Sequence, residues 1–222
     1  MAAALTLPPH AVAVDLGFGA VPWTSAEWLT SLRGRWPEVR LRAVDADPAR
    51  VEAARQGVEV EGMRFEVGGF DLPPGGAHLI RAMNVLRQYR DPEVPGALAA
   101  MAAGLAPGGL LFEGTSDHPG DVLAAQCLRL DGGAVALEGL LLACSGARGC
   151  APALFRDFLP RSLRRGRDPT GAAAALLSAW EPLWRQEAGE PHERILRSAS
   201  ALTGGMAWHL PAGFAVWWSP AP

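Results

Sequence analysis

Two aspartates stand at the ends of apolar segments, where a carboxylate is well placed to bind a ligand. Asp15 follows the small and β-branched residues 11–14, and Asp45 ends the stretch 39–45. Gly17 and Gly19 come directly after the first aspartate, and glycines at this spacing let the backbone turn tightly and approach a ligand closely. A carboxylate can accept hydrogen bonds from both hydroxyls of a sugar, so the pattern predicts a nucleotide site. The alternative is that both aspartates only cap helices.

The elements that must position these residues are predicted from hydrophobic periodicity. Strands are expected at residues 11–15, 39–45, 63–67, 77–85 and 110–115. Helix starts are expected at Thr24-Ser25, Asp47-Pro48 and Asp91-Pro92, whereas the loop 68–76 is too short for a full crossover helix. This alternation predicts an α/β fold: a mostly parallel sheet with helices on both faces and the ligand at the carboxyl ends of the strands.

The pattern changes beyond residue 117. Residues 126–130 and 134–143 flank Asp131-Gly132-Gly133, which is typical of a hairpin and predicts antiparallel strands. Residues 172–184 and 192–202 have helical patterns, and residues 207–219 indicate a strand. We therefore divide the chain into a ligand-binding domain, residues 1–145, and an extension of helices plus a final strand, residues 146–222, packed on the same domain.

The charge balance gives no general attraction to polyanions. The 222 residues carry a net charge of −3 and are 49% hydrophobic, as in a soluble globular protein. All 20 basic residues are arginines. One cluster of them fits either a solvated face or a site for RNA or a phosphorylated acceptor: Arg156, Arg161, Arg164, Arg165 and Arg167.

The cysteines and the apolar stretches indicate a cytoplasmic protein. Cys127, Cys144 and Cys150 are spaced too widely for a zinc knuckle and are odd in number for disulfides, so buried thiols and no metal site are expected. The first ten residues lack the basic start of a signal peptide, and no apolar stretch is long enough to span a bilayer. We expect no membrane partner, and no pattern specifies an oligomeric state.

Tryptophans are concentrated in the second half of the chain. Packing into a small core is the expected role, rather than a cage for an acceptor, of Trp180, Trp184, Trp208, Trp217 and Trp218. Trp217 and Trp218 are adjacent in a strand-like segment, so they are expected to face opposite sides of a sheet.

Four segments in a fixed order carry a resemblance to a known family. They are Asp15-Leu16-Gly17-Phe18-Gly19, Val44-Asp45-Ala46-Asp47, residues 65–73, and Leu105-Ala106-Pro107-Gly108-Gly109. Over roughly residues 11–117 the chain resembles the class I S-adenosylmethionine-dependent methyltransferases, whose fold is a Rossmann-like α/β sheet. Residues 80–89 together with 113–117 are also similar to a poorly described group of bacterial methyltransferase-like proteins.

The resemblance implies S-adenosylmethionine as the cofactor, bound by residues 1–145. Asp45 would hold the ribose diol, Asp15 would order the amino acid end, and the glycine turn would pass close to both. The residues implied in cofactor binding are Asp15, Gly17, Phe18, Gly19, Asp45, Ala46, Phe70, Asp71 and Asn84. Two departures from the family pattern are Ala20 in place of the third glycine and Phe70 at the position of the adenine-reading acid, which puts Asp71 one residue late.

The implied reaction is an in-line displacement of the methyl group from a sulfonium, which needs alignment more than a dedicated catalytic residue. Tyr89 and His118 are candidate bases for an acceptor hydroxyl. A small molecule or RNA is the expected acceptor, and the sequence does not decide between them. The segment after residue 83 lacks the Asn-Pro-Pro-aromatic signature of enzymes that methylate amino groups of DNA bases, so DNA is not expected.

Two other functions fit parts of the pattern. A nicotinamide-dependent oxidoreductase also has a glycine loop followed by an acid on the second strand, but its third glycine would fall at Pro22. A non-catalytic binding module could keep the fold without the reaction. Binding of S-adenosylhomocysteine rather than NAD or NADP separates a methyltransferase from an oxidoreductase. A methyl-transfer screen separates a methyltransferase from a binding module.

Overall fold

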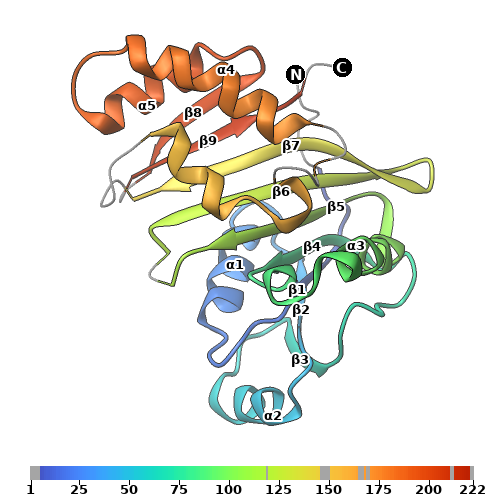
Figure 1. Cartoon of the computed structure of the whole chain (residues 1–222). Coiled ribbons are helices and arrows are strands. Elements are labelled where there is room, and N and C mark those ends of the chain that lie inside the picture. Colours follow the sequence, from blue (N-terminus) through green and yellow to red (C-terminus); the bar gives the residue numbers. More distant parts are fainter. Residues whose placement is uncertain are drawn as a thin grey trace.

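Nine strands of the described residues form one mixed sheet (Figure 1). The computed structural model describes residues 6–118, 120–145, 151–164, 168, 171–210 and 213–220. The strands are β1 (Val12–Leu16), β2 (Arg40–Asp45), β3 (Met63–Val67), β4 (Ala77–Met83), β5 (Leu105–Ser116), β6 (Val122–Asp131), β7 (Ala134–Cys144), β8 (Gly205–Leu210) and β9 (Gly213–Trp218). Their order across the sheet is β3-β2-β1-β4-β5-β6-β7-β9-β8.

Five α-helices and four short 3-10 helices of the described residues complete the chain. The α-helices are α1 (Trp23–Arg33), α2 (Pro48–Gly57), α3 (Val94–Ala103), α4 (Ala172–Gln186) and α5 (Pro191–Ser200). The 3-10 helices are η1 (Leu86–Gln88), η2 (Asp91–Glu93), η3 (Pro152–Phe158) and η4 (Arg161–Leu163).

The strands from β1 to β5 are parallel, as predicted. β1 lies between β2 and β4, so Asp15 at its end is flanked by Ala43 and Arg81 in the register. No helix occurs between β3 and β4, which agrees with the short loop 68–76. The strands from β5 to β7 and the pair β8–β9 run antiparallel. The predicted mostly parallel α/β sheet with added antiparallel strands is therefore confirmed, and its first half has the Rossmann-like order 3-2-1-4-5.

Helices cover both faces of the sheet. Successive residues of a strand point to opposite faces, so neighbouring residues pack against different helices. Ala13 packs with Leu29 of α1, and Ala43 packs with α2. Val14 packs on the other face with Met101 of α3. On that same face α5 lies over β8 and β9 and packs against α4 (Figure 1), and Trp180 of α4 is fully buried there.

The first helix begins differently from the prediction. Pro22 precedes α1, and no side chain caps its first turn, so Thr24 and Ser25 lie inside the helix. Ser25 is buried and donates its hydroxyl hydrogen to Asp15 Oδ2 at 2.6 Å. The hydroxyl that would cap the helix is therefore used by the carboxylate at the end of β1. The predicted cap of α2 is confirmed, since Asp47 Oδ1 accepts the Ala49 N–H at 2.9 Å.

Three strand boundaries also differ. β6 begins at Val122 rather than at residue 126. β4 ends at Met83 rather than at residue 85, because Asn84 adopts a left-handed conformation with φ +61°. β5 begins at Leu105 and includes the Pro107-Gly108-Gly109 segment expected to be only a turn. The register of β4 and β5 shifts between Ala77 and Leu79 at that place, which accommodates the extra residues.

The antiparallel half contains one strand more than predicted. The hairpin of β6 and β7 is confirmed, with Gly132 and Gly133 at φ +57° and +88° in its turn. The tail forms two strands, β8 and β9, rather than the single final strand expected for residues 207–219. A hairpin lets each strand satisfy the backbone groups of the other, which one long strand at a sheet edge cannot do. Trp217 and Trp218 belong to clusters on opposite faces, as predicted.

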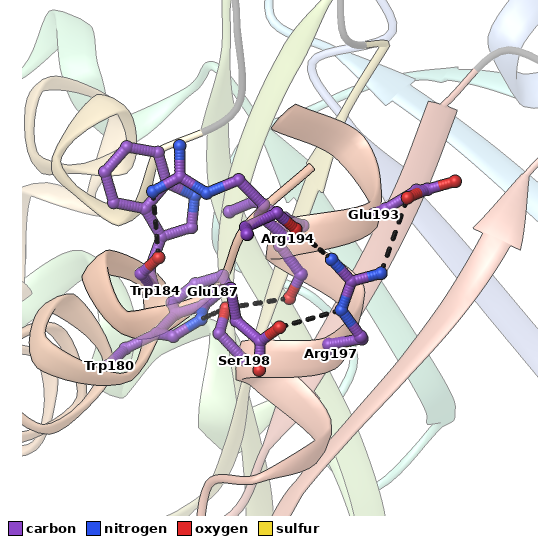
Figure 2. A network of polar contacts seen from close by, with 9 residues as sticks. Trp180, Trp184, Glu187, Glu193, Arg194, Arg197 and Ser198 are labelled. Atoms are coloured by element: carbon purple, nitrogen blue, oxygen red, sulfur yellow. Dashed lines mark hydrogen bonds and ion pairs between the residues drawn. The ribbon is translucent and has the colours of Figure 1, made fainter. Parts of the chain in front are cut away.

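Polar contacts of tryptophan and arginine join α4 to α5 (Figure 2). The Trp180 indole donates its N–H to Ser198 Oγ at 2.9 Å. The Arg194 guanidinium lies 3.9 Å from the ring centre of Trp184, and its Nη2 donates to the carbonyl oxygen of that residue. The packing role predicted for these tryptophans is confirmed. The prediction of a packing role was wrong for Trp208, because its side chain is 45% exposed.

The arginine cluster is not one solvated face. Arg161 donates to Asp91 Oδ1 and to the Arg87 carbonyl oxygen, each at 3.0 Å, so it ties η4 to the segment before α3. Arg164 donates to the Leu159 carbonyl oxygen at 3.2 Å, whereas Arg156 is exposed. Arg165 and Arg167 lie outside the described residues.

Two of the predicted buried thiols are confirmed. Cys127 and Cys144 are buried, and burial raises the pKa of the Cys127 thiol to about 12. Cys150 lies outside the described residues. In the part of the chain that is described, no helix is both long and apolar enough to cross a bilayer.

Candidate functional site

A cavity of about 570 Å³ lies at the carboxyl ends of β1, β2 and β4. It is on the edge of the sheet where the sequence predicted a ligand. Most of the residues proposed for cofactor binding line it: Asp15, Gly17, Phe18, Gly19, Asp45, Ala46 and Asn84. Its volume lies in the range of small-molecule sites.

Three proposed residues do not line this cavity. Asp71 is exposed in the loop after β3, and His118 is exposed beyond β5. Phe70 lies behind the wall, since its ring packs against Tyr89 with ring centres 5.2 Å apart. Tyr89 itself lines the cavity, so it is the candidate base that the fold brings to the site.

A larger cavity of about 790 Å³ lies at the opposite ends of β1, β2 and β3. It is lined by charged side chains that include Arg40, Arg64 and Glu38. None of the residues proposed from the sequence lies there. Because ligands of open parallel sheets bind at the carboxyl ends of the strands, the smaller cavity is the better candidate.

Asp15 is 3% exposed and is bound from two sides. Arg81 Nε donates to Asp15 Oδ1 at 2.9 Å, and Arg81 Nη2 donates to Oδ2 at 2.5 Å. Ser25 donates the third hydrogen bond. The Arg81 guanidinium also stacks on Trp28, 4.6 Å from the ring centre. Asp15 therefore caps no helix, and its charge is balanced by a bidentate arginine.

Asp45 is 5% exposed and holds the glycine turn in place. Its Oδ2 accepts the Gly19 N–H at 3.0 Å, and its Oδ1 accepts the Asp47 N–H at 2.9 Å. Arg50 Nη1 lies 3.7 Å from Oδ1. Each carboxylate oxygen can accept more than one hydrogen bond, so Asp45 keeps the capacity to bind a ligand.

The two glycines of the turn serve different purposes. Both have left-handed backbones, with φ +72° at Gly17 and +81° at Gly19. A Cβ on Gly17 would lie 2.7 Å from Val85 Cγ2, so Gly17 is required for packing. A Cβ on Gly19 would meet no atom within 4 Å, because Gly19 borders the open cavity.

Asn84 joins the ends of β4 and β5. Its Nδ2 donates to Ser116 Oγ at 2.8 Å, and its Oδ1 accepts the Ser116 N–H at 2.9 Å. Its backbone N–H donates to the Gly114 carbonyl oxygen at 2.8 Å. Asn84, which the resemblance implies in cofactor binding, therefore shapes the cavity wall through Ser116.

Sequence reasoning missed Arg81, Ser25 and Ser116. Only Arg81 carries a signal in the sequence, because it is a charged residue inside the apolar segment of β4. Arginine is rarely buried unless it is paired, so it predicts an acidic partner on a neighbouring strand. The partner could not be identified without the register of β1 and β4.

Glu113 is a second buried carboxyl group that sequence reasoning missed. It lies on β5, is 1% exposed, and its Oε2 accepts the Gln126 Nε2 hydrogen bond at 2.8 Å. Gln126 also donates to Ser162 Oγ of η4 at 2.8 Å. Burial raises the pKa of Glu113 to about 7, while the Gln126 hydrogen bond and the Arg164 charge oppose the rise. Glu113 does not line the cavity, so it belongs to the packing under η4.

Among the residues that the structure describes, no group of three or more His, Cys, Asp and Glu side chains is arranged to hold a metal ion. The charged groups of the cavity are instead paired with one another. The site can therefore bind a polar organic ligand through its carboxylates, its guanidinium groups and its glycine turn.

Comparisons with known proteins find a likeness in structure only. No family model matches the chain, and no curated protein matches it. About half of the chain is similar in structure to solved methyltransferases, including one described as S-adenosylmethionine-dependent and one in complex with S-adenosylmethionine. The Rossmann-like fold expected from the sequence is confirmed by the strand order of the sheet itself.

Three of the similar structures illustrate the extent of the likeness. A chain of a Haloferax volcanii complex that contains a methyltransferase activator has 25% identity over 50% of this chain and 48% of that one, with a TM-score of 0.40. Human N-acetylserotonin methyltransferase has 25% identity over 47% and 29%, with a TM-score of 0.39. A Mesorhizobium loti methyltransferase has 20% identity over 50% and 49%, with a TM-score of 0.38. Each match spans less than half of the solved chain.

Proposed function

We propose that the cavity binds S-adenosylmethionine and that the chain transfers its methyl group to an acceptor. The observation that carries this proposal is the setting of Asp45. A buried carboxylate ends β2, and the N–H groups of Gly19 and Asp47 hold it in place. A ribose presents two adjacent hydroxyl groups, and a fixed carboxylate can accept hydrogen bonds from both.

The open space beside Gly19 supports the same ligand. A side chain at this position would enter the cavity, and glycine leaves room for a flat nucleoside to lie against the backbone. Phe18 and Ala46 also line the cavity. Phe70 would contribute through Tyr89, against which it packs. We leave Asp71 out of the proposal because it does not line the cavity.

The pair of Asp15 and Arg81 fits the amino acid end of the cofactor. That end carries an ammonium group and a carboxylate, so it matches an acid paired with a base. Arg81 uses Nε and Nη2 for Asp15, and guanidinium has further N–H donors at Nη1. We therefore assign the ligand carboxylate to Arg81 and the ligand ammonium to Asp15.

The reaction needs alignment of the acceptor with the methyl group. When bound, S-adenosylmethionine supplies a methyl group on a positively charged sulfur. Gln88, Tyr89, Ser116 and Leu123 line the remaining wall, so they would position the acceptor and exclude water. Tyr89 has a hydroxyl group that can relay a proton from an acceptor oxygen. A small molecule or RNA is the proposed acceptor.

One observation favours a second candidate, a binding module without the reaction. The side chains of Asp15 and Asn84 are committed to Arg81 and Ser116. A site whose polar groups bind one another resembles a stable wall, and fold alone does not establish catalysis. Such a module would bind the nucleotide product and transfer no methyl group.

The test is calorimetric titration of the protein with S-adenosylhomocysteine, with NAD and NADP as controls. Micromolar binding of S-adenosylhomocysteine alone is expected. Binding of a dinucleotide alone would support an oxidoreductase instead, and binding of none of the three would remove the proposed function. A screen of small molecules and RNA with labelled S-adenosylmethionine then separates the enzyme from the module.

A further inference from the structure

The strand β8 forms one edge of the sheet. It pairs with β9 on one side, and no described strand pairs with its other side (Figure 1). An edge strand carries a row of backbone N–H and C=O groups that can pair with another chain. Proteins that remain monomeric protect such edges with charged residues, proline or a covering segment.

The two edges of this sheet differ in that protection. At the other edge, β3 carries Arg64 and Glu66 among its five residues. β8 has the sequence Gly-Met-Ala-Trp-His-Leu, with no proline, lysine, arginine or carboxylate. The β8 edge therefore lacks the residues that prevent pairing, although β3 in the same chain has them.

The side chains of β8 also present an apolar surface. Met206, Trp208 and Leu210 are 48%, 45% and 45% exposed, and their alternation places them on one face of the strand. Ala207 points to the opposite face and packs with the cluster that contains α4 and α5. The exposed apolar row is therefore on the face that these helices do not cover.

We propose that two copies of this chain pair through β8, antiparallel about a two-fold axis, to make one continuous sheet. A register centred on Trp208 places it against its own copy and places Met206 against Leu210 of the partner subunit. Aromatic and apolar pairs directly opposite each other stabilise antiparallel strands. The strand is thus its own complement, whereas a charged partner strand would find no opposite charge on it.

The dimer does not depend on the proposed methyl transfer. β8 is the last strand of the sheet, and β4, β5, β6, β7 and β9 separate it from β1. Pairing at β8 leaves the cavity at the ends of β1, β2 and β4 accessible. The oligomeric state and the binding of S-adenosylhomocysteine can therefore fail or succeed separately.

The test is sedimentation equilibrium of the full chain over roughly a hundredfold range of concentration. The wild type is expected to show a reversible dimer. Trp208→Glu places two like charges opposite each other and should weaken dimerisation by about tenfold or more. Trp23→Glu is the matched control, since Trp23 is 64% exposed on α1, and it should dimerise as the wild type does.

Two results would overturn the proposal: a wild type that stays monomeric throughout, or a Trp208→Glu variant that dimerises with unchanged affinity. Circular dichroism checks that each variant is folded. If Trp208→Glu does not fold, Met206→Glu replaces it, because Met206 is on the same exposed face and the same weakening is expected.

Discussion

Arg81 of β4 holds both carboxylate oxygens of Asp15 of β1, across 66 positions of sequence. The register of the two parallel strands places the residues side by side. Asp15 is buried, and the guanidinium is further held by Trp28. The pair therefore fixes the place where the glycine turn leaves β1.

Removal of Arg81 should be costly for the fold. Arg81→Met leaves Asp15 buried with only the Ser25 hydrogen bond, and loss of one partner of a buried pair costs about 3 kcal/mol. Urea unfolding measures this loss. Arg42→Met is the control, because Arg42 forms a bidentate pair with the more exposed Glu66 and should lose about 1 kcal/mol or less. Equal losses in the two variants would contradict the buried role of Arg81.

The two turn glycines should respond differently to alanine. Both substitutions strain a left-handed backbone by about 1–2 kcal/mol. Gly17→Ala also forces its Cβ against Val85, so it should be the more destabilising variant in thermal unfolding, and Val85→Ala should relieve part of the loss. Gly19→Ala projects into the cavity instead and should weaken the binding of S-adenosylhomocysteine. Equal losses of stability and equal losses of affinity in the two variants would show that the two positions are equivalent.

Asp45→Ala should separate ligand binding from helix capping. It removes a buried acceptor of the proposed ribose and is expected to weaken S-adenosylhomocysteine binding by about 1.5 to 3 kcal/mol. Asp47→Ala is the matched control, since Asp47 caps α2, so its loss should cost about 1 kcal/mol of stability and leave affinity intact. Calorimetric titration of both folded variants with S-adenosylhomocysteine measures the two affinities. Unchanged affinity in Asp45→Ala would remove that residue from the site.

Glu113 should make stability fall as the pH rises. Burial raises its pKa from 4.5 to about 7, so between these values the folded protein binds a proton that the unfolded chain releases. The free energy of unfolding therefore decreases through this range, by roughly 3 kcal/mol at most, and levels off above it. Glu113→Gln keeps an acceptor for Gln126 and should lack this loss.

Urea unfolding of the wild type and Glu113→Gln at about pH 5 and about pH 8 measures the difference. The variant should gain stability relative to the wild type at the higher pH. A gap between the two proteins that is the same at both pH values would show that Glu113 does not titrate in this range.

Much of the first half of the fold was predictable because its signals are local. The apolar runs, the glycine turn and the Asp47 cap each depend on residues close in sequence. They predicted a mostly parallel sheet and the edge where Asp15 and Asp45 lie. The partners of those aspartates were not predictable. Arg81 reaches Asp15 only through the register of β1 and β4, which periodicity does not specify.

The second half was less predictable for a related reason. The tryptophans indicated a core, and Trp180 does form one, but Trp208 is exposed because β8 is an edge strand. Whether a tryptophan is buried or exposed depends on where its element lies in the fold rather than on the composition of the segment. Phe70 was likewise placed at the cavity, whereas the loop after β3 sets it behind Tyr89.

The structure of the protein in complex with S-adenosylhomocysteine is the most direct test of cofactor binding in this cavity. We expect the ribose hydroxyls to lie within hydrogen-bonding distance of the Asp45 carboxylate, the nucleoside to pass over Gly19, and the ligand carboxylate to contact Arg81. A ligand bound elsewhere, or a cavity that stays empty at saturating S-adenosylhomocysteine, would contradict it.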